Sequence, residues 1–256
     1  MEAKAEFTVE DALNRLEPNL PGPVRHRLRN SLNNFYRAAH LFDLDREMSS
    51  FRAITGEEEA ASALMKAVHL RGYEHSRELN PRDHVHKAAV MACVGAIAST
   101  MKPMLGEFQL IFDFDKRRVD VKVPLTAFNV SGGDSYAIQP VEPLGLTFTR
   151  PGVDRQNLYD DVLKQIAGIG SFDSIKKMVS ATANERNRLL YASDATTPRS
   201  FATTRSIRNR KLRAQTMLVL AIMVLQSRDQ LPLVREAILA FLGIISRLPQ
   251  EHRADG

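Results

Sequence analysis

Apolar residues return at steps of three and four along most of the chain, which is the spacing of helices with one buried face. Residues 7–17 predict a short helix that begins after Thr8, with Asp11 three residues later in a variant of the capping box. A second amphipathic helix is predicted from Val24 to about Ser50. The first third of the chain is therefore expected to be helical.

A further helix is predicted to start after Thr55, because Thr55 and Glu58 have the spacing of a capping box. Glu57, Glu58 and Glu59 would then lie in its first turn, where the helix dipole favours negative charge. The next helix is predicted to start in "NPRDHVHK", with Asn80 as N-cap and Pro81 at the first helical position. It continues through an apolar stretch that indicates a buried helix.

The period changes to two further along the chain. Residues 108–114 and 118–123 alternate apolar and polar side chains, and the three residues between them suit a hairpin turn. "SYAIQPV" and "GLTFTR" predict two more strands. We therefore expect a small antiparallel β unit at 106–152.

Helical patterning resumes at residue 154, and the last two helices are predicted at about Ser206–Arg228 and Pro232–Leu248. The predicted fold class is mainly α, a helical bundle with an inserted small antiparallel β-sheet unit. The predicted divisions are a short helix with a Pro-rich linker, the first part of the bundle, the β unit, the second part of the bundle and a disordered tail, at residues 1–23, 24–105, 106–152, 153–248 and 249–256.

Composition narrows the class of protein. The 256 residues suit one large domain or one domain with an insertion, and the single cysteine, Cys93, excludes an internal disulfide and a zinc site built on cysteines. The beginning of the sequence has no signal-peptide pattern. The most apolar stretch, 217–226, is shorter than the roughly 20 residues that span a bilayer. A cytoplasmic protein without a membrane partner is expected.

Common catalytic motifs are missing from the sequence. It contains no GxxxxGK[ST], no GxGxxG after a strand, no HExxH and no GxSxG. This counts against the P-loop, Rossmann, zincin and α/β-hydrolase classes.

Chemistry concentrates in "NPRDHVHK". His84 and Lys87 share one face of the predicted helix, and the helix dipole near its start keeps an imidazole neutral, as a general base must be. Lys87 could hold an anion, and Arg82 or Arg77 could stabilise a pentacovalent phosphate. These are the minimum groups for RNA cleavage without a metal or cofactor, since the 2′-hydroxyl supplies the nucleophile. The alternative is that His84 only caps or packs.

Two further segments could bind a substrate. In "NERNRLLYASD", Arg186, Asn187 and Tyr191 could orient RNA from a neighbouring helix or from a partner subunit; the alternative is a solvated helix end. The run 199–213 holds six basic residues and no acidic one, within a net charge of +5. Its Arg205, Arg208 and Arg210 could neutralise phosphates, or the run could be a solvated surface.

Together, these stretches resemble the HEPN superfamily, and within it the AbiV-like abortive-infection proteins. The likeness rests on "AITGEEEAASALMKA", "RDHVHKAAV" and "RNRLLYASD", with matches at Glu58, Glu59, His84, Lys87, Leu190 and Tyr191. The resemblance implies a helical bundle that commonly dimerises and acts in nucleic-acid cleavage or antiviral defence. Arg77 and His84 have the spacing of the HEPN ribonuclease signature, but Pro81 interrupts a regular helix between them.

Two hypotheses follow. In the first, the protein is a HEPN-like homodimer that acts on RNA in phage defence or a stress response, with His84 as general base or acid. In the second, it is a non-catalytic module that binds a regulatory protein or nucleic acid, and Glu58, Glu59 and His84 form a buried polar network. A cleft in which His84 and an arginine both reach solvent would favour the first.

Overall fold

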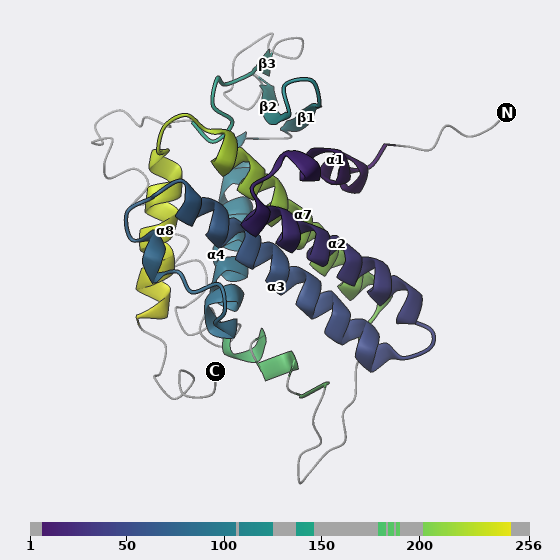
Figure 1. Cartoon of the computed structure of the whole chain (residues 1–256). Helices are drawn as coiled ribbons and strands as arrows, with labels where there is room; N and C mark the ends of the chain where they lie inside the picture. Colours follow the sequence, from purple (N-terminus) through teal and green to yellow (C-terminus); the bar gives the residue numbers. More distant parts are fainter. Residues whose placement is uncertain are drawn as a thin grey trace, which may run out of the picture.

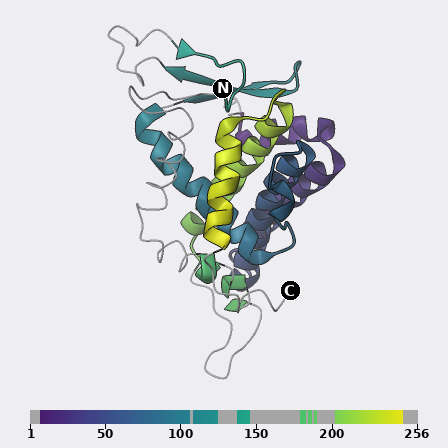
Figure 2. The same ribbon diagram turned by 90° about the vertical axis from the view of Figure 1, so that its left-hand side faces the viewer.

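The structure is a computed structural model, and it describes residues 7–105, 108–124, 137–145, 179–182, 184–186, 188–189 and 202–246. The protein is mainly helical, with packed helices and a small three-stranded antiparallel sheet at one end (Figures 1 and 2). The predicted fold class is confirmed. The predicted strand "GLTFTR" after Gly145, most of the helical pattern from 154, and the tail 249–256 lie outside the described residues.

The first helix forms as its capping residues predict. α1, Val9–Leu16, is capped by Thr8, whose hydroxyl accepts from the backbone N–H of Asp11, while the Asp11 carboxylate accepts from the backbone N–H of Thr8. Leu13 and Leu16 are buried in the core. A 3₁₀ turn, η1 at Glu17–Asn19, then leads to the next helix.

The following helix boundary differs from the prediction. α2, Gly22–Leu41, ends well before Ser50, and α3, Arg46–Leu70, runs straight through Thr55. The carboxylate of Asp45 accepts from the N–H of Met48 and caps α3. Thr55 is no cap, because its hydroxyl donates to the carbonyl of Phe51 within the helix. The three glutamates therefore lie in the middle of a long helix.

α3 is the central helix of the bundle. α2 packs along one side of it and α7, Thr204–Gln226, along another (Figure 1). α2 approaches closely at Gly56, where a Cβ atom would lie 2.8 Å from the ring of Phe35 and 3.1 Å from the carbonyl of Ser31. The Ser31 hydroxyl donates to the Gly56 carbonyl over 2.7 Å.

The helix after "NPRD" begins later than predicted. α4 spans His84–Leu105 and follows a second 3₁₀ turn, η2 at Ser76–Glu78. Asp83, not Asn80, caps it: the Asp83 carboxylate accepts from the N–H groups of Val85 and His86, at 2.7 and 3.2 Å. The Asn80 side chain instead accepts from the N–H of Arg82 in the preceding turn. An aspartate so close to the helix start takes the capping role because its oxygen reaches two free N–H groups.

The predicted hairpin is confirmed. β1, Gln109–Asp113, pairs antiparallel with β2, Arg118–Pro124, and β2 pairs with β3, Ala137–Ile138. Gln226, at the end of α7, joins the sheet to the bundle, because its amide exchanges hydrogen bonds with both backbone groups of Val119. The β unit is therefore anchored to the bundle.

The two C-terminal helices are confirmed within a few residues. α7 begins after Thr203, which forms a capping box with Ser206, and α8 spans Pro232–Ile245. α8 packs against α4. Among the described residues, no helix is both long and apolar enough to cross a membrane.

Candidate functional site

A chain of polar contacts joins α3 to the start of α4. Glu58, on α3, is buried, and its Oε1 accepts from Nδ1–H of His84 over 2.9 Å. The ammonium of Lys87 lies 3.6 Å from the other oxygen of Glu58. His84 and Lys87 lie one helical turn apart on α4, so both reach the same carboxylate. The predicted pairing of His84 with Lys87 on one face is therefore present.

The third member of the chain comes from far along the sequence. Nη1 of Arg186, in the helical residues 184–186, lies 2.8 Å from Nε2 of His84. A guanidinium can only donate, so Nε2 must be the acceptor and Nδ1 must carry the proton that Glu58 accepts. These partners assign a neutral imidazole whose lone pair is on Nε2.

This series of polar contacts reaches the protein surface at His84. The His84 side chain is 40% exposed, whereas that of Glu58 is 9% exposed. The guanidinium of Arg186 lies over the ring of Phe51, at 5.3 Å from its centroid, and the Nε of Arg186 is buried without a hydrogen-bond partner among the described residues. His84 is therefore a half-open group held between a buried carboxylate and an arginine.

The environment of Glu58 favours its charged form. Burial raises the pKa of its carboxyl, but the hydrogen bond from His84 and the charges of Lys87, His84 and Arg186 outweigh burial. Its pKa is therefore held below the ordinary 4.5. At neutral pH, Glu58 is an anion that orients His84 and balances Lys87.

A second ion network was not predicted from the sequence. Glu57 is 1% exposed, and its two oxygens bind two arginines of α7: Nη1 of Arg210 at 2.5 Å and Nε of Arg213 at 2.5 Å. Arg210 also donates to Glu185 over 2.6 Å. Glu185 precedes Arg186, so this network ties the segment that carries Arg186 to α7. The acidic triplet could have indicated this network from the sequence. On one continuous helix, neighbouring glutamates point about 100° apart and therefore face different helices.

The structure brings together only part of the predicted site. Glu58, His84, Lys87 and Arg186 meet; the other predicted residues are Arg77, Arg82, Glu59, Asn187, Tyr191, Arg205, Arg208 and Arg210. Arg77 and Arg82 are exposed, and in the described part of the chain the side-chain hydrogen bonds of His84 are with Glu58 and Arg186 instead. Asn187 and Tyr191 lie outside the described residues.

The remaining predicted residues divide between the surface and the interior. Among the described residues, Glu59 takes no part in the network around His84, and the adjacent Glu57 and Glu58 are the buried glutamates. Arg205 and Arg208 are exposed on the first turns of α7, whereas Arg210 turns inward to its two carboxylates. The basic run is therefore partly neutralised inside the protein.

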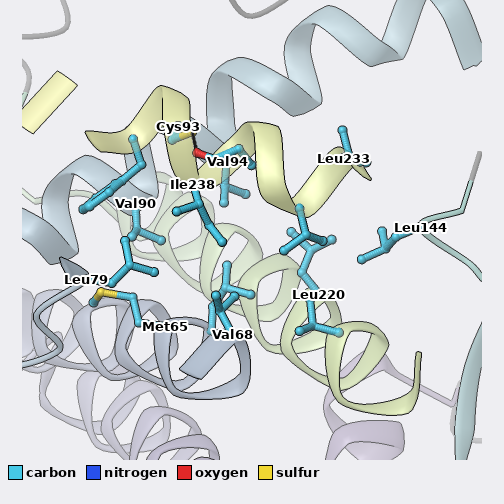
Figure 3. A pocket seen from close by; sticks show the side chains of 15 residues that line it. Met65, Val68, Leu79, Val90, Cys93, Val94, Leu144, Leu220, Leu233 and Ile238 are labelled. Atoms are coloured by element: carbon cyan, nitrogen blue, oxygen red, sulfur yellow. Dashed lines mark hydrogen bonds between the residues drawn. The ribbon is translucent and has the colours of Figure 1, made fainter. Parts of the chain in front are cut away.

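An apolar cavity of about 120 Å³ lies elsewhere, between α3, α4, α7 and α8 (Figure 3). Side chains such as Met65, Leu220 and Ile238 line it. The thiol of Cys93 is buried there beside the carbonyl of Ala237, and burial raises its pKa to about 12. The cysteine is therefore not a nucleophile at neutral pH.

Within the described ranges, no group of three or more His, Cys, Asp and Glu side chains is placed to hold a metal ion. Comparison of the chain with protein-family models, curated proteins and solved structures gives no match.

Proposed function

We propose that this is a HEPN-like protein that cleaves RNA without a metal, through Glu58, His84 and Arg186. The observation that carries the proposal is the contact chain from the buried Glu58 carboxylate through a half-exposed imidazole to a guanidinium. A carboxylate that fixes the tautomer of a histidine, next to a cation, is a recurrent arrangement for proton transfer beside a developing negative charge.

The reaction uses the 2′-hydroxyl of RNA as nucleophile. Arg186 turns from Nε2 of His84 to a phosphate oxygen, which frees the Nε2 lone pair. His84 then takes the 2′-hydroxyl proton while the 2′-oxygen attacks phosphorus and the bond to the 5′-oxygen breaks. The imidazolium returns that proton to the leaving 5′-oxygen. The products are a 2′,3′-cyclic phosphate and a 5′-hydroxyl.

The charge balance of the site favours an anionic substrate. The two networks contain four cations, Lys87, Arg186, Arg210 and Arg213, and three carboxylates, Glu57, Glu58 and Glu185. With His84 neutral, four minus three leaves one positive charge. Because Arg186 has no carboxylate partner in the described residues, the excess charge lies beside the exposed edge of His84. A phosphate would provide the missing negative charge.

The resemblance of the sequence to AbiV-like proteins supports phage defence or a stress response as the biological setting, and a homodimer as the working form. Here the arginine beside His84 is Arg186 in place of the predicted Arg77 or Arg82. The proposal therefore assigns the phosphate-stabilising role to Arg186 and an auxiliary charge to Lys87.

The experiment is cleavage of end-labelled total RNA in EDTA by the wild-type protein, by His84→Ala and by His86→Ala. His86 is a matched control because it lies in the same first turn, where its ring packs on Phe241. We expect His84→Ala to lose about 10²–10⁴-fold in rate and His86→Ala to keep most activity, with equal helicity by circular dichroism. No cleavage by the wild type, or equal cleavage by all three, would reject the proposal.

A second function is favoured by one feature: the Nε2 of His84 already has a partner in the free protein. In a non-catalytic interaction module, the same contacts would only lock α3, α4 and residues 184–186 together. That module predicts a lower free energy of unfolding for His84→Ala and no RNA cleavage by the wild type.

A further inference from the structure

α2 is a strongly basic helix. Its 20 residues, Gly22–Leu41, include four arginines and two histidines and no aspartate or glutamate. Its buried side, with Leu28, Leu32 and Phe35, packs into the core. The opposite side faces solvent, and its exposed polar residues are His26, Arg29, Asn30, Asn33, Tyr36, Arg37 and His40. These positions recur at helical spacing and form one continuous stripe, which we call the α2 face.

Of the four arginines of α2, two are paired with a carboxylate in the described residues, and two, Arg27 and Arg37, are not. Arg25 and Arg29 share the carboxylate of Glu17, at 3.9 and 2.9 Å. Arg27 is half-buried beside the α2 face, and among the described residues its side chain donates only to the neutral carbonyl of Pro23, over 2.8 Å. Arg37 is exposed and has no carboxylate within ion-pair distance among the described residues. The basic run at 199–213 differs, because its Arg210, Lys211 and Arg213 are paired with acidic side chains.

The α2 face also exposes an aromatic ring. The side chain of Tyr36 is 63% exposed, and its ring lies against that of His40, with centroids 4.1 Å apart and planes at 42°. His40 is held in turn by a hydrogen bond between its Nδ1 and the carbonyl of Tyr36, 2.8 Å. A supported ring next to the exposed guanidinium of Arg37 is the combination that proteins use to stack bases and hold phosphates of single strands.

We propose that the α2 face binds single-stranded RNA, with a base stacked on Tyr36, a phosphate on Arg37 and a further phosphate on Arg27 at the edge of the face. Charge complementarity selects a polyanion, and the exposed ring selects a strand with unpaired bases over a duplex. This binding surface is separate from His84, since the α2 face is on the solvent side of α2 while Glu58 faces α4. It goes beyond the cleavage reaction and does not depend on it.

The test is fluorescence anisotropy with a labelled 2′-O-methyl oligouridine of about 12 nucleotides, within the usual range for single-strand sites. This probe lacks a free 2′-hydroxyl, so its binding is measured independently of cleavage. Affinity is recorded from low to physiological salt for the wild type, for Arg27→Gln/Arg37→Gln and for Arg205→Gln/Arg208→Gln. The last pair is the matched control: it removes the same charge from exposed positions on α7.

For a single strand, each phosphate contact contributes about 0.7 to the slope of log affinity against log salt, so the α2 pair should lower that slope by about 1.4. The control pair should leave it nearly unchanged. Tyr36→Ala should weaken binding about 5- to 100-fold, while Tyr36→Phe, which keeps the ring, should bind as the wild type. An equal loss in both arginine pairs, an unchanged Tyr36→Ala, or no binding by the wild type would overturn the proposal.

Discussion

Glu57 and Glu58 are consecutive, both buried and both charged, yet their surroundings differ. Glu57 faces α7, where Arg210 and Arg213 occupy both its oxygens. Glu58 faces α4, where it binds Lys87 and a histidine that reaches solvent. One carboxylate is enclosed by permanent cations; the other is connected to a group that can gain or lose a proton.

The difference shows what distinguishes a structural ion network from a candidate site. Arginine remains protonated at any working pH, so the Glu57 network can hold helices together but cannot exchange protons. Histidine titrates near neutrality, and its exposed edge lets a ligand approach. The two glutamates should therefore respond differently to substitution.

The largest expected change in stability is at Glu57. Glu57→Gln leaves Arg210 and Arg213 without the anion that they share. Arg210 keeps Glu185 and Arg213 is half exposed, so the loss should lie at the lower end of the range of about 3–5 kcal/mol that breaking a buried ion pair costs. Urea unfolding of this variant measures the loss. Glu59→Gln is the matched control, because Glu59 lies two residues further along α3 and belongs to neither network as far as the described residues show. Equal stability of the two variants would show that the Glu57 network does not hold α3 and α7 together.

Glu58→Gln should cost about 1.5–3 kcal/mol at neutral pH, because it replaces a charged hydrogen bond by a neutral one and removes the anion 3.6 Å from the buried Lys87. The cost should be smaller than at Glu57, because the Lys87 ion pair is longer than the two arginine pairs. The pKa of Glu58 is lowered in the folded protein, so its charge stabilises the fold above the ordinary 4.5 and that contribution disappears as the pH falls through the folded-state pKa. The stability difference between wild type and Glu58→Gln should therefore shrink in acid. A difference that stays constant from neutral pH to pH values well below 4.5 would contradict this account.

Gly56, immediately before both glutamates, allows α2 to approach α3. Gly56→Ala forces a Cβ against the ring of Phe35, and such overpacking costs about 1–3 kcal/mol, more than the gain of about 1 kcal/mol in helix propensity. Gly243, in α8, has open space around it and is the control. Thermal unfolding should show a lower midpoint for Gly56→Ala and an equal or higher one for Gly243→Ala. A stabilised Gly56→Ala would show that α2 can move away at no cost.

The smallest effect is expected for a substitution at Glu58 on the reactivity of Cys93, which lies on α4 together with His84. Because burial raises the pKa of Cys93 to about 12, the folded protein should react with a thiol reagent at pH 8 at least about 100-fold more slowly than the urea-unfolded chain. Glu58→Gln should leave this slow rate close to that of the wild type if α4 stays packed. Prompt reaction of the native wild type would contradict the packing of α4.

The sequence predicted helices, hairpin and fold class well, because their periodicities are local. Its errors were at helix starts: Asp83 caps α4 in place of Asn80, and the helix predicted to begin after Thr55 begins at Arg46, capped by Asp45. That last error placed Glu57 and Glu58 in an exposed first turn and concealed their separate partners. His84, Lys87, Glu58 and Arg186 could each be found by residue type. Their meeting could not, because the contact of Arg186 with His84 spans 102 residues and depends on tertiary packing.

Whether the 2′-hydroxyl of RNA is the nucleophile is tested with an oligodeoxynucleotide that carries a single ribonucleotide, incubated with the wild-type protein in EDTA. We expect one cut, on the 3′ side of that ribonucleotide, giving a 2′,3′-cyclic phosphate and a 5′-hydroxyl, and no cut in the all-deoxy strand. Cleavage of the all-deoxy strand, or a product with a 5′-phosphate, would show that the 2′-hydroxyl is not the nucleophile. Either result would contradict the role assigned to His84.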